Sequence, residues 1–272
     1  MAKILINGCS HSIPFLHESQ NQHGHNAHVH QPKYTGKSWP EIFKEITDTE
    51  VISLAEGGKS NHWMIEELIR YIINDSSIDH IIIMLTELKR FNLYKRAKSN
   101  EWEIGNIKSQ FSRLKNNGDL KYNSKFYVRF SIEEDDNSLD FAKSAAFKNF
   151  NDESLIHQII TTGTMLNALA MICSFKNIGL TIGNFDSIPL KFLNDTVWNS
   201  IPFNYFLSTN IENGLLDYFF NKDREKYKTN NSHLNQIANG EIAETIKAHY
   251  LYGDQMNISE PTKRYNFIYR YL

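Results

Sequence analysis

Short apolar runs alternate with helix-like patterns along this chain. Four runs have the character of buried parallel strands, and they cover residues 3–7, 51–54, 81–85 and 178–182. A fifth strand is expected at 203–207. Between the runs, apolar residues recur at helical spacing, which predicts helices after Ser60, from Ser154 to about Phe175, and from Asn235 to His249.

This alternation predicts an α/β protein with a three-layer α/β/α architecture and an open, mainly parallel sheet. Residues 92–150 interrupt the alternation, because they are rich in Asn, Lys, Ser and Asp. An alternating pattern within 122–132 predicts a hairpin there. We therefore expect one domain, 1–272, with 92–150 as an insertion or lid after the third strand.

Composition narrows the classes of function. Lys plus Arg number 29 and Asp plus Glu number 31, a formal net charge of −2, which argues against a nucleic-acid-binding surface. Cys9 and Cys173 are too few for a disulfide framework, so we expect a reduced, cytoplasmic type of protein. The chain shows neither a signal-peptide pattern nor an uninterrupted apolar stretch of membrane-spanning length, so no membrane contact is expected.

Polar, chemically capable residues follow the predicted strands. In an open α/β sheet, ligands bind outside the carboxyl ends of the strands. The segments at those ends, together with the one just before the last helix, are Gly8–Ser12, Ala55–Asn61, Thr86–Arg90 and Asn230–Asn235. The sequence therefore predicts that these four segments surround one site.

Two of these segments carry a family resemblance. Gly8-Cys9-Ser10 resembles the Gly-x-Ser block of the SGNH (GDSL-type) hydrolases, with Cys9 where an Asp is usual. Ser53 to Gly58 keeps the Ala and the Gly of that family's Asn-x-Ala-x-x-Gly block but has Ser53 in place of the Asn.

The other two segments resemble the remaining blocks of the family. Thr86-Glu87 stands where the family has Asn-Asp, and Asn230 to His233 keeps the His of an Asp-x-x-His block but not its Asp. The four blocks occur in the family's order over most of the chain. Divergent chains of this kind are familiar among phage-encoded proteins, which would make the location cytoplasmic or virion-associated.

The resemblance implies a flavodoxin-like fold and a serine esterase. Ser10 would be the nucleophile, His233 its base, and Asn230 the third catalytic residue, which can orient the imidazole but carries no charge. The backbone N–H groups of Ser10 and Gly58 and the hydroxyl of Thr86 would form the oxyanion hole.

Substrate contacts are expected from Arg90 and Asn61. The implied substrate is a small ester, such as an O-acetyl group on a glycan, and neither a cofactor nor a metal is expected. Assembly into an oligomer or a larger particle is left open.

Each motif also has a plainer interpretation. In that interpretation, Gly8 marks only a tight turn, and the segment before the last helix is only a helix entry capped by Asn230 or Ser232. The departures from the family blocks suit an alternative function, a weak or inactive domain that serves as a ligand-binding or structural module.

Five histidines lie close together in one polar segment, at His17, His23, His25, His28 and His30. Imidazole binds zinc and similar metals, but this segment contains no Cys, and no carboxylate stands between Glu18 and Glu41. We expect a segment at the rim of the site that holds no structural metal.

Overall fold

The structure is a computed structural model that describes residues 1–13, 36–56, 59–88, 90–96, 102–108, 127–129, 152–188, 197–227 and 234–258. Within these ranges, the backbone alone is described for Ser10, for the strands between residues 90 and 129, and for residues 152–155.

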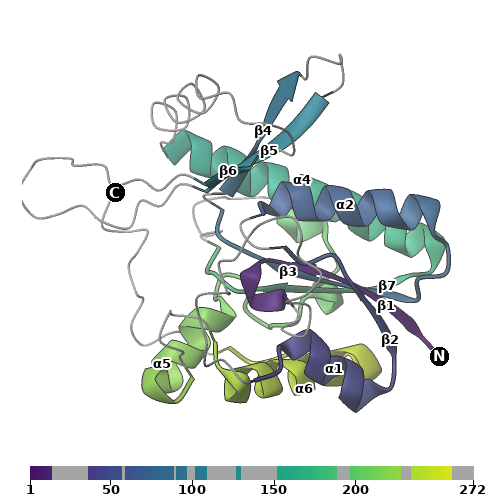
Figure 1. Cartoon of the computed structure of the whole chain (residues 1–272), viewed down its shortest axis with the longest axis vertical. Coiled ribbons are helices and arrows are strands. Elements are labelled where there is room, and N and C mark those ends of the chain that lie inside the picture. Colours follow the sequence, from purple (N-terminus) through teal and green to yellow (C-terminus); the bar gives the residue numbers. More distant parts are fainter. Residues whose placement is uncertain are drawn as a thin grey trace, which may run out of the picture.

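A four-stranded parallel sheet forms the centre of the described part (Figure 1). Its order is β2-β1-β3-β7, with bounds Glu50–Ser53, Lys3–Gly8, His80–Leu85 and Gly179–Asn184. The first four predicted strands are thus confirmed, each to within two residues. This order is that of the flavodoxin-like sheets, in which the order of successive strands reverses between β1 and β3 while all strands stay parallel.

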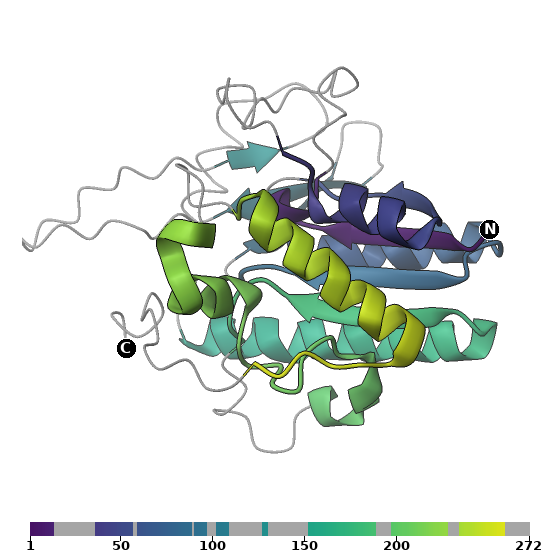
Figure 2. The same cartoon turned by 90° about the horizontal axis from the view of Figure 1, so that it is seen from below.

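Helices cover both faces of the sheet, so the predicted three-layer architecture is confirmed (Figures 1 and 2). On one face lie α2 (Asn61–Asn74) and α4 (Asp152–Lys176). On the other lie α1 (Trp39–Thr47) and α6 (Gln236–Tyr252), with α5 (Leu215–Tyr227) packed beside α6.

The alternation of side chains along the strands divides the core in two. Leu5, Ile81 and Ile83 pack among the residues of α2 and α4, whereas Ile4 and Ile82 pack among those of α1 and α6. All five are fully buried. This is why the strands read as continuous apolar runs in the sequence.

Capping side chains fix where the helices begin. The Ser60 hydroxyl accepts from the Trp63 N–H (3.2 Å), and α2 begins directly after Ser60, as the helical spacing predicts. The helix α1, which the sequence analysis does not predict, begins with a capping box of Ser38 and Glu41. Ser154 is not a cap, because α4 begins two residues earlier, at Asp152.

The fifth predicted strand is wrong. Residues Phe203–Tyr205 form a 3-10 turn, η5, in which the Phe206 N–H donates to the Phe203 carbonyl (3.1 Å). The Tyr205 N–H likewise donates to the Pro202 carbonyl (3.0 Å). Within 203–207 only Phe206 makes a parallel bridge, with Ile182 of β7.

Between β3 and α4 the chain forms a second, antiparallel sheet. It contains β4 (Arg90–Arg96), β5 (Trp102–Lys108) and β6 (Tyr127–Arg129), in that order. Of the predicted hairpin at 122–132, only β6 is described, and β6 pairs with β5. The pairing of β4 with β5 was missed, because their alternation is short and crowded with charged residues. The role of 92–150 as an insertion or lid stays a prediction.

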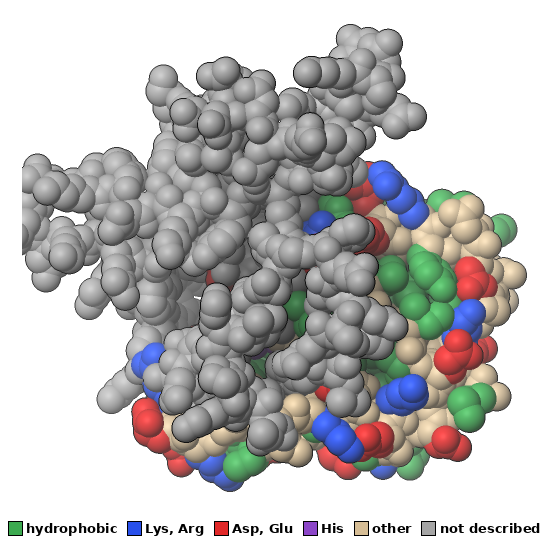
Figure 3. Space-filling model, in the orientation of Figure 1, with side chains coloured by type: hydrophobic (Ala, Val, Ile, Leu, Met, Phe, Trp, Pro, Cys, Tyr) green, Lys and Arg blue, Asp and Glu red, His purple; other side chains and the backbone are tan. Residues whose placement is uncertain are grey.

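Among the described residues, one helix is long and apolar enough to cross a membrane, although no such stretch was expected. It is Ile156–Lys176 of α4, whose most apolar window has a mean hydropathy of 1.3. Leu166, Leu169 and Cys173 of this helix are buried against the sheet and α2, and 39% of its most apolar window is buried. On the described part of the face in Figure 3, acidic and basic side chains are interspersed.

Candidate active site

The strand register brings two predicted site residues to equivalent positions. Gly8 of β1 pairs with Met84 of β3, so Ser10 and Thr86 each lie two residues beyond that pair. The flanking strands end at the same edge, since the Glu56 N–H donates to the Gly8 carbonyl (3.2 Å) beyond β2. At the end of β7, the Phe185 N–H donates to the Leu85 carbonyl (2.9 Å). The predicted meeting of strand ends is therefore present in the backbone.

The turn after β1 is tightly packed. Ser10 opens a short 3-10 turn, η1 (Ser10–Ser12), in which the Ser12 N–H donates to the Cys9 carbonyl (2.8 Å). The Trp39 indole N–H of α1 donates to the Ser12 hydroxyl (3.2 Å). A Cβ on Gly8 would lie 2.7 Å from that of Ser12, and Gly8 does not have a positive φ. Gly8 is therefore required by close packing, rather than by the backbone freedom that a plain turn would use.

Thr86 is held through its backbone, and its side-chain hydroxyl is not used in these hydrogen bonds. The Asn61 side chain donates to the Thr86 carbonyl (3.0 Å) and accepts from the Thr86 N–H (2.8 Å). The Thr86 side chain is 2% exposed, and its Oγ1 has no hydrogen-bond partner in the described part of the chain. A buried hydroxyl without a partner is costly, so this atom suits a ligand oxygen.

These contacts also define what Asn61 does. Both ends of its buried amide are bonded to the backbone of Thr86, which gives Asn61 a structural role at the end of β3. The prediction that Asn61 contacts substrate stays a prediction. Ser53, which stands at the family's Asn position, accepts from the Ala55 N–H (3.3 Å) and shapes the segment that leads to Gly58.

Sequence reasoning missed the most connected side chain near this turn, Asn7. Its Oδ1 accepts from the Gly8 N–H (2.8 Å), while its Nδ2 donates to the Met64 carbonyl (3.0 Å) and to the Glu67 carboxylate (3.3 Å) of α2. Burial raises the pKa of Glu67 to about 7, and the bond from Asn7 opposes that rise. A polar residue inside a buried strand was the available signal.

A second missed pair lies beyond β7. The Ser187 hydroxyl donates to the Asp217 carboxylate of α5, and burial raises the pKa of Asp217. The rings of His11 and Phe185 stack with centroids 4.8 Å apart, which joins the η1 turn to the end of β7. A carboxylate and a hydroxyl thus lie on the same side of the sheet as the predicted nucleophile turn.

Several predicted site residues lie outside the described residues. They are Gly58, Asn230 and His233, and the side chains of Ser10 and Arg90 are likewise not described. Arg90 is the first residue of β4. Their predicted roles as nucleophile, base, third catalytic residue, oxyanion donor and substrate contact stay predictions.

The neighbours of the predicted nucleophile and base share one core. Cys9 and Leu234 are buried in the same hydrophobic cluster, on the α6 side of the sheet. Asn235 caps α6, since its Oδ1 accepts from the Ile237 N–H (3.0 Å) and the Ala238 N–H (3.2 Å). The alternative in which Asn230 or Ser232 caps this helix is therefore wrong.

In the part of the chain that the structure describes, no three His, Cys, Asp or Glu side chains are placed to hold a metal ion. The segment with the five clustered histidines lies outside that part. Its predicted position at the rim of the site stays a prediction.

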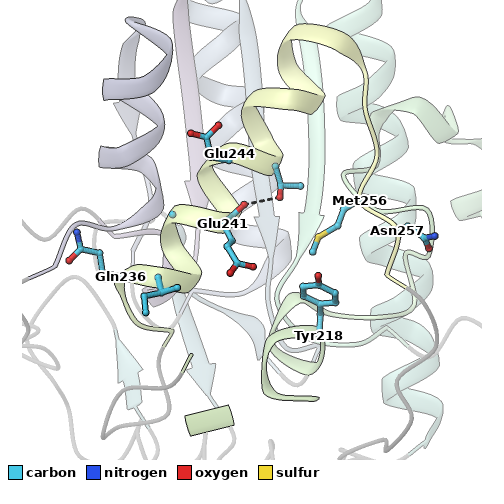
Figure 4. Close-up of a pocket in the computed structure, with 9 residues that line it drawn as sticks. Tyr218, Gln236, Glu241, Glu244, Met256 and Asn257 are labelled. Carbon is cyan, nitrogen blue, oxygen red and sulfur yellow. Dashed lines mark hydrogen bonds between the residues drawn. The ribbon is translucent and has the colours of Figure 1, made fainter. Parts of the chain in front are cut away.

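A shallow hollow of about 600 Å³ lies between α5 and α6 (Figure 4). Tyr218, Ile237, Glu241 and Met256 contribute to its lining, as does Gln236 at the start of α6. The Glu241 carboxylate already accepts from the Tyr227 hydroxyl (2.8 Å) and from a lysine of α5 (3.2 Å).

No protein-family model matches this chain, and no curated protein matches it by sequence. Among solved structures, it is similar to the psychrotrophic esterase EstA from Pseudoalteromonas sp., inhibited by monoethylphosphonate (13% identity, TM-score 0.41, 91% of this chain and 95% of that chain covered). A lipase from a goat rumen metagenome gives 10% identity and a TM-score of 0.42 over 91% of this chain and 97% of that chain. A member of the lipolytic G-D-S-L family from Veillonella parvula gives 13% identity and a TM-score of 0.39 over 93% of this chain and 98% of that chain. These likenesses are too distant to assign an activity, which has to be argued from this chain's own residues.

Proposed function

We propose that this protein is a serine ester hydrolase of the SGNH type, with Ser10 as nucleophile and His233 as base. The observation that carries the proposal is the end of β3. Ser10 and Thr86 each stand two positions beyond the paired residues Gly8 and Met84. Asn61 holds the Thr86 backbone, and the buried Thr86 hydroxyl has no described partner. A fixed donor without a partner is what an oxyanion hole requires.

The reaction would proceed in two steps, acylation of Ser10 and hydrolysis of the acyl-serine. The Ser10 oxygen attacks the ester carbonyl while His233 takes its proton, and the negative oxygen formed is held by Thr86 and by backbone N–H groups of Ser10 and Gly58. The intermediate collapses, the alcohol leaves with the proton from His233, and an acyl-serine remains. Water, deprotonated by His233, then releases the acid and restores Ser10.

Asn230 stands where a carboxylate would support the histidine. An Asn can orient an imidazole but cannot stabilise its charge, so we propose slow turnover on a small ester, such as a glycan O-acetyl group contacted by Arg90. The buried carboxylate of Asp217 is a second candidate for the missing charge. Neither a cofactor nor a metal has a part in this scheme.

Covalent labelling of Ser10 tests the proposal. We expect a fluorophosphonate to modify wild-type protein at Ser10, and p-nitrophenyl acetate turnover to fall to background in Ser10→Ala. Thr86→Val should lower kcat about 10²–10³-fold, because it removes one oxyanion donor at nearly constant shape. Labelling is read by peptide mass spectrometry, which is independent of the turnover rate.

Thr162→Val is the matched control. Thr162 of α4 is also buried, and its hydroxyl also has no described partner, but it lies in the helix layer away from the strand ends. Its variant should keep wild-type turnover. Wild-type protein that is neither labelled nor faster than Ser10→Ala would reject the hydrolase and favour a ligand-binding or structural module.

A further inference from the structure

The start of the predicted nucleophile turn is tied to α2 through one side chain. Asn7 is fully buried, and its amide joins the Gly8 N–H on one side to the Met64 carbonyl and the Glu67 carboxylate on the other. Gly8 in turn packs so closely on Ser12 that no Cβ fits between them. A displacement of Asn7 therefore has to move the turn.

We infer that Asn7 is a positioning residue for the Gly8–Ser12 turn, and that Glu67 sets, through Asn7, how firmly the turn is held. The inference rests on the proposed function in so far as Ser10 is the reacting group of that turn. Asn7 and Glu67 do not touch substrate in this scheme. They act through the backbone of Gly8.

The physical basis is the kind of acceptor that Glu67 offers. An ionised carboxylate accepts a shorter and roughly twice stronger hydrogen bond than a neutral group. When Glu67 takes up a proton, the bond from Asn7 weakens and the Asn7 amide is held mainly by the Met64 carbonyl. Because burial raises the pKa of Glu67 to about 7, this change falls near neutral pH.

One amide and three charged groups face Glu67. Asn7 approaches from β1, Glu56 and Lys59 from the segment before α2, and Arg70 from α2 itself. Lys59 is paired with Glu56 (3.1 Å), and its Nζ lies 3.7 Å from the centre of the Trp63 ring. Lys59 and Arg70 favour the ionised carboxylate and Glu56 opposes it, so burial remains the main cause of the raised pKa.

Trp39 provides a signal that requires no enzyme activity. Its indole N–H donates to Ser12, at the end of the same turn, so its NMR resonance reports the position of Ser12. We expect this resonance, assigned with Trp39→Phe, to shift with pH around a midpoint near 7. The Trp198 indole, which donates to the Ile159 carbonyl of α4 (2.9 Å), should stay fixed and serves as the internal reference.

Three variants decide the inference. Glu67→Gln should abolish the titration of the Trp39 signal, and Asn7→Asp should displace that signal at every pH, because it removes the donor to Met64 and Glu67. Glu66→Gln is the matched control, since Glu66 neighbours Glu67 but pairs with Arg70 (3.3 Å). Its protein should titrate as wild type does. A Trp39 signal that titrates unchanged in Glu67→Gln would overturn the inference.

A second readout separates this inference from the proposed function. If both hold, Glu67→Gln should slow phosphonate labelling of Ser10 roughly five-fold at pH 8, the ratio expected when a neutral acceptor replaces a charged one. It should also flatten the pH profile near 7. Ser10 that is inert in wild-type protein rejects the hydrolase alone, because the Trp39 titration still supports or refutes the positioning role.

Discussion

Buried polar residues of the central sheet lie at the ends of its strands and also inside its layers. Within the layers, His80 Nε2 lies 2.8 Å from the hydroxyl of Thr181, which lies 3.0 Å from Nδ1 of His249. The other nitrogen of His249 is bonded to the Asn204 carbonyl (3.0 Å). The network connects β3, β7 and α6 across the core, with the Tyr250 ring edge-on to His80.

This network predicts a loss of stability in acid. Burial, together with a smaller effect of the neighbouring His249, lowers the pKa of His80 to about 4. The unfolded chain binds the proton below about pH 6.5, so His80 contributes fully to stability above that pH. The contribution is lost as the pH falls from 6.5 to about 4. The loss should be of the order of 3 kcal/mol in the free energy of unfolding.

Urea unfolding measured between pH 8 and pH 4 checks this expectation. His80→Gln should be less stable at pH 8 but should lose less stability on acidification than wild type. His157→Gln, which changes an exposed histidine of α4, should follow wild type throughout. Parallel pH curves for wild type and His80→Gln would contradict the prediction.

At the scale of elements, the contact of α4 with the η4 turn (Val197–Ser200) requires a glycine, Gly163, in α4. The ring of Trp198 is buried over α4, and its indole donates to the Ile159 carbonyl. A Cβ on Gly163 would lie 2.7 Å from Trp198 Cδ1. Glycine in the middle of a helix has an entropic cost, so close packing explains its presence here.

Gly163→Ala should therefore destabilise the protein by about 1–3 kcal/mol through overpacking, despite the better helix propensity of alanine. Gly240→Ala in α6 is the matched control, because its Cβ would meet nothing within 4 Å. That variant should be stabilised by about 0.5–1 kcal/mol. The midpoints of thermal unfolding of the two variants should thus move in opposite directions, and a shared direction would contradict the packing argument.

At the scale of the whole molecule, the described residues form one hydrophobic cluster on each side of the sheet, and the clustered histidines are expected to add no structural metal. We expect purified protein to contain no stoichiometric zinc, and its melting temperature to be unchanged by a chelator. Metal analysis and thermal unfolding with and without the chelator measure this. Bound zinc that is lost, together with stability, in His25→Ala and His28→Ala would contradict the expectation.

The alternation of apolar runs with helical patterns was sufficient to predict the main sheet and its layers. Runs such as Ile81–Leu85 are buried on both faces, and only parallel strands between two helical layers have that environment. The candidate turn after β1 was found for a related reason, since small and polar residues directly follow a buried strand. The start of α2 after Ser60 was also predicted, because helical spacing is a local pattern.

Contacts between residues distant in the sequence were decided by the tertiary structure alone. The bond from Asn7 to Glu67 spans 60 positions and the clamp of Asn61 on Thr86 spans 25, and neither leaves a local pattern. The run 203–207 is mostly apolar and predicts a strand, yet it begins with a 3-10 turn, because the N–H groups of Tyr205 and Phe206 donate to nearby carbonyls. Local periodicity records which faces are buried, whereas the partner of each polar group depends on strand order and register, which only the folded chain sets.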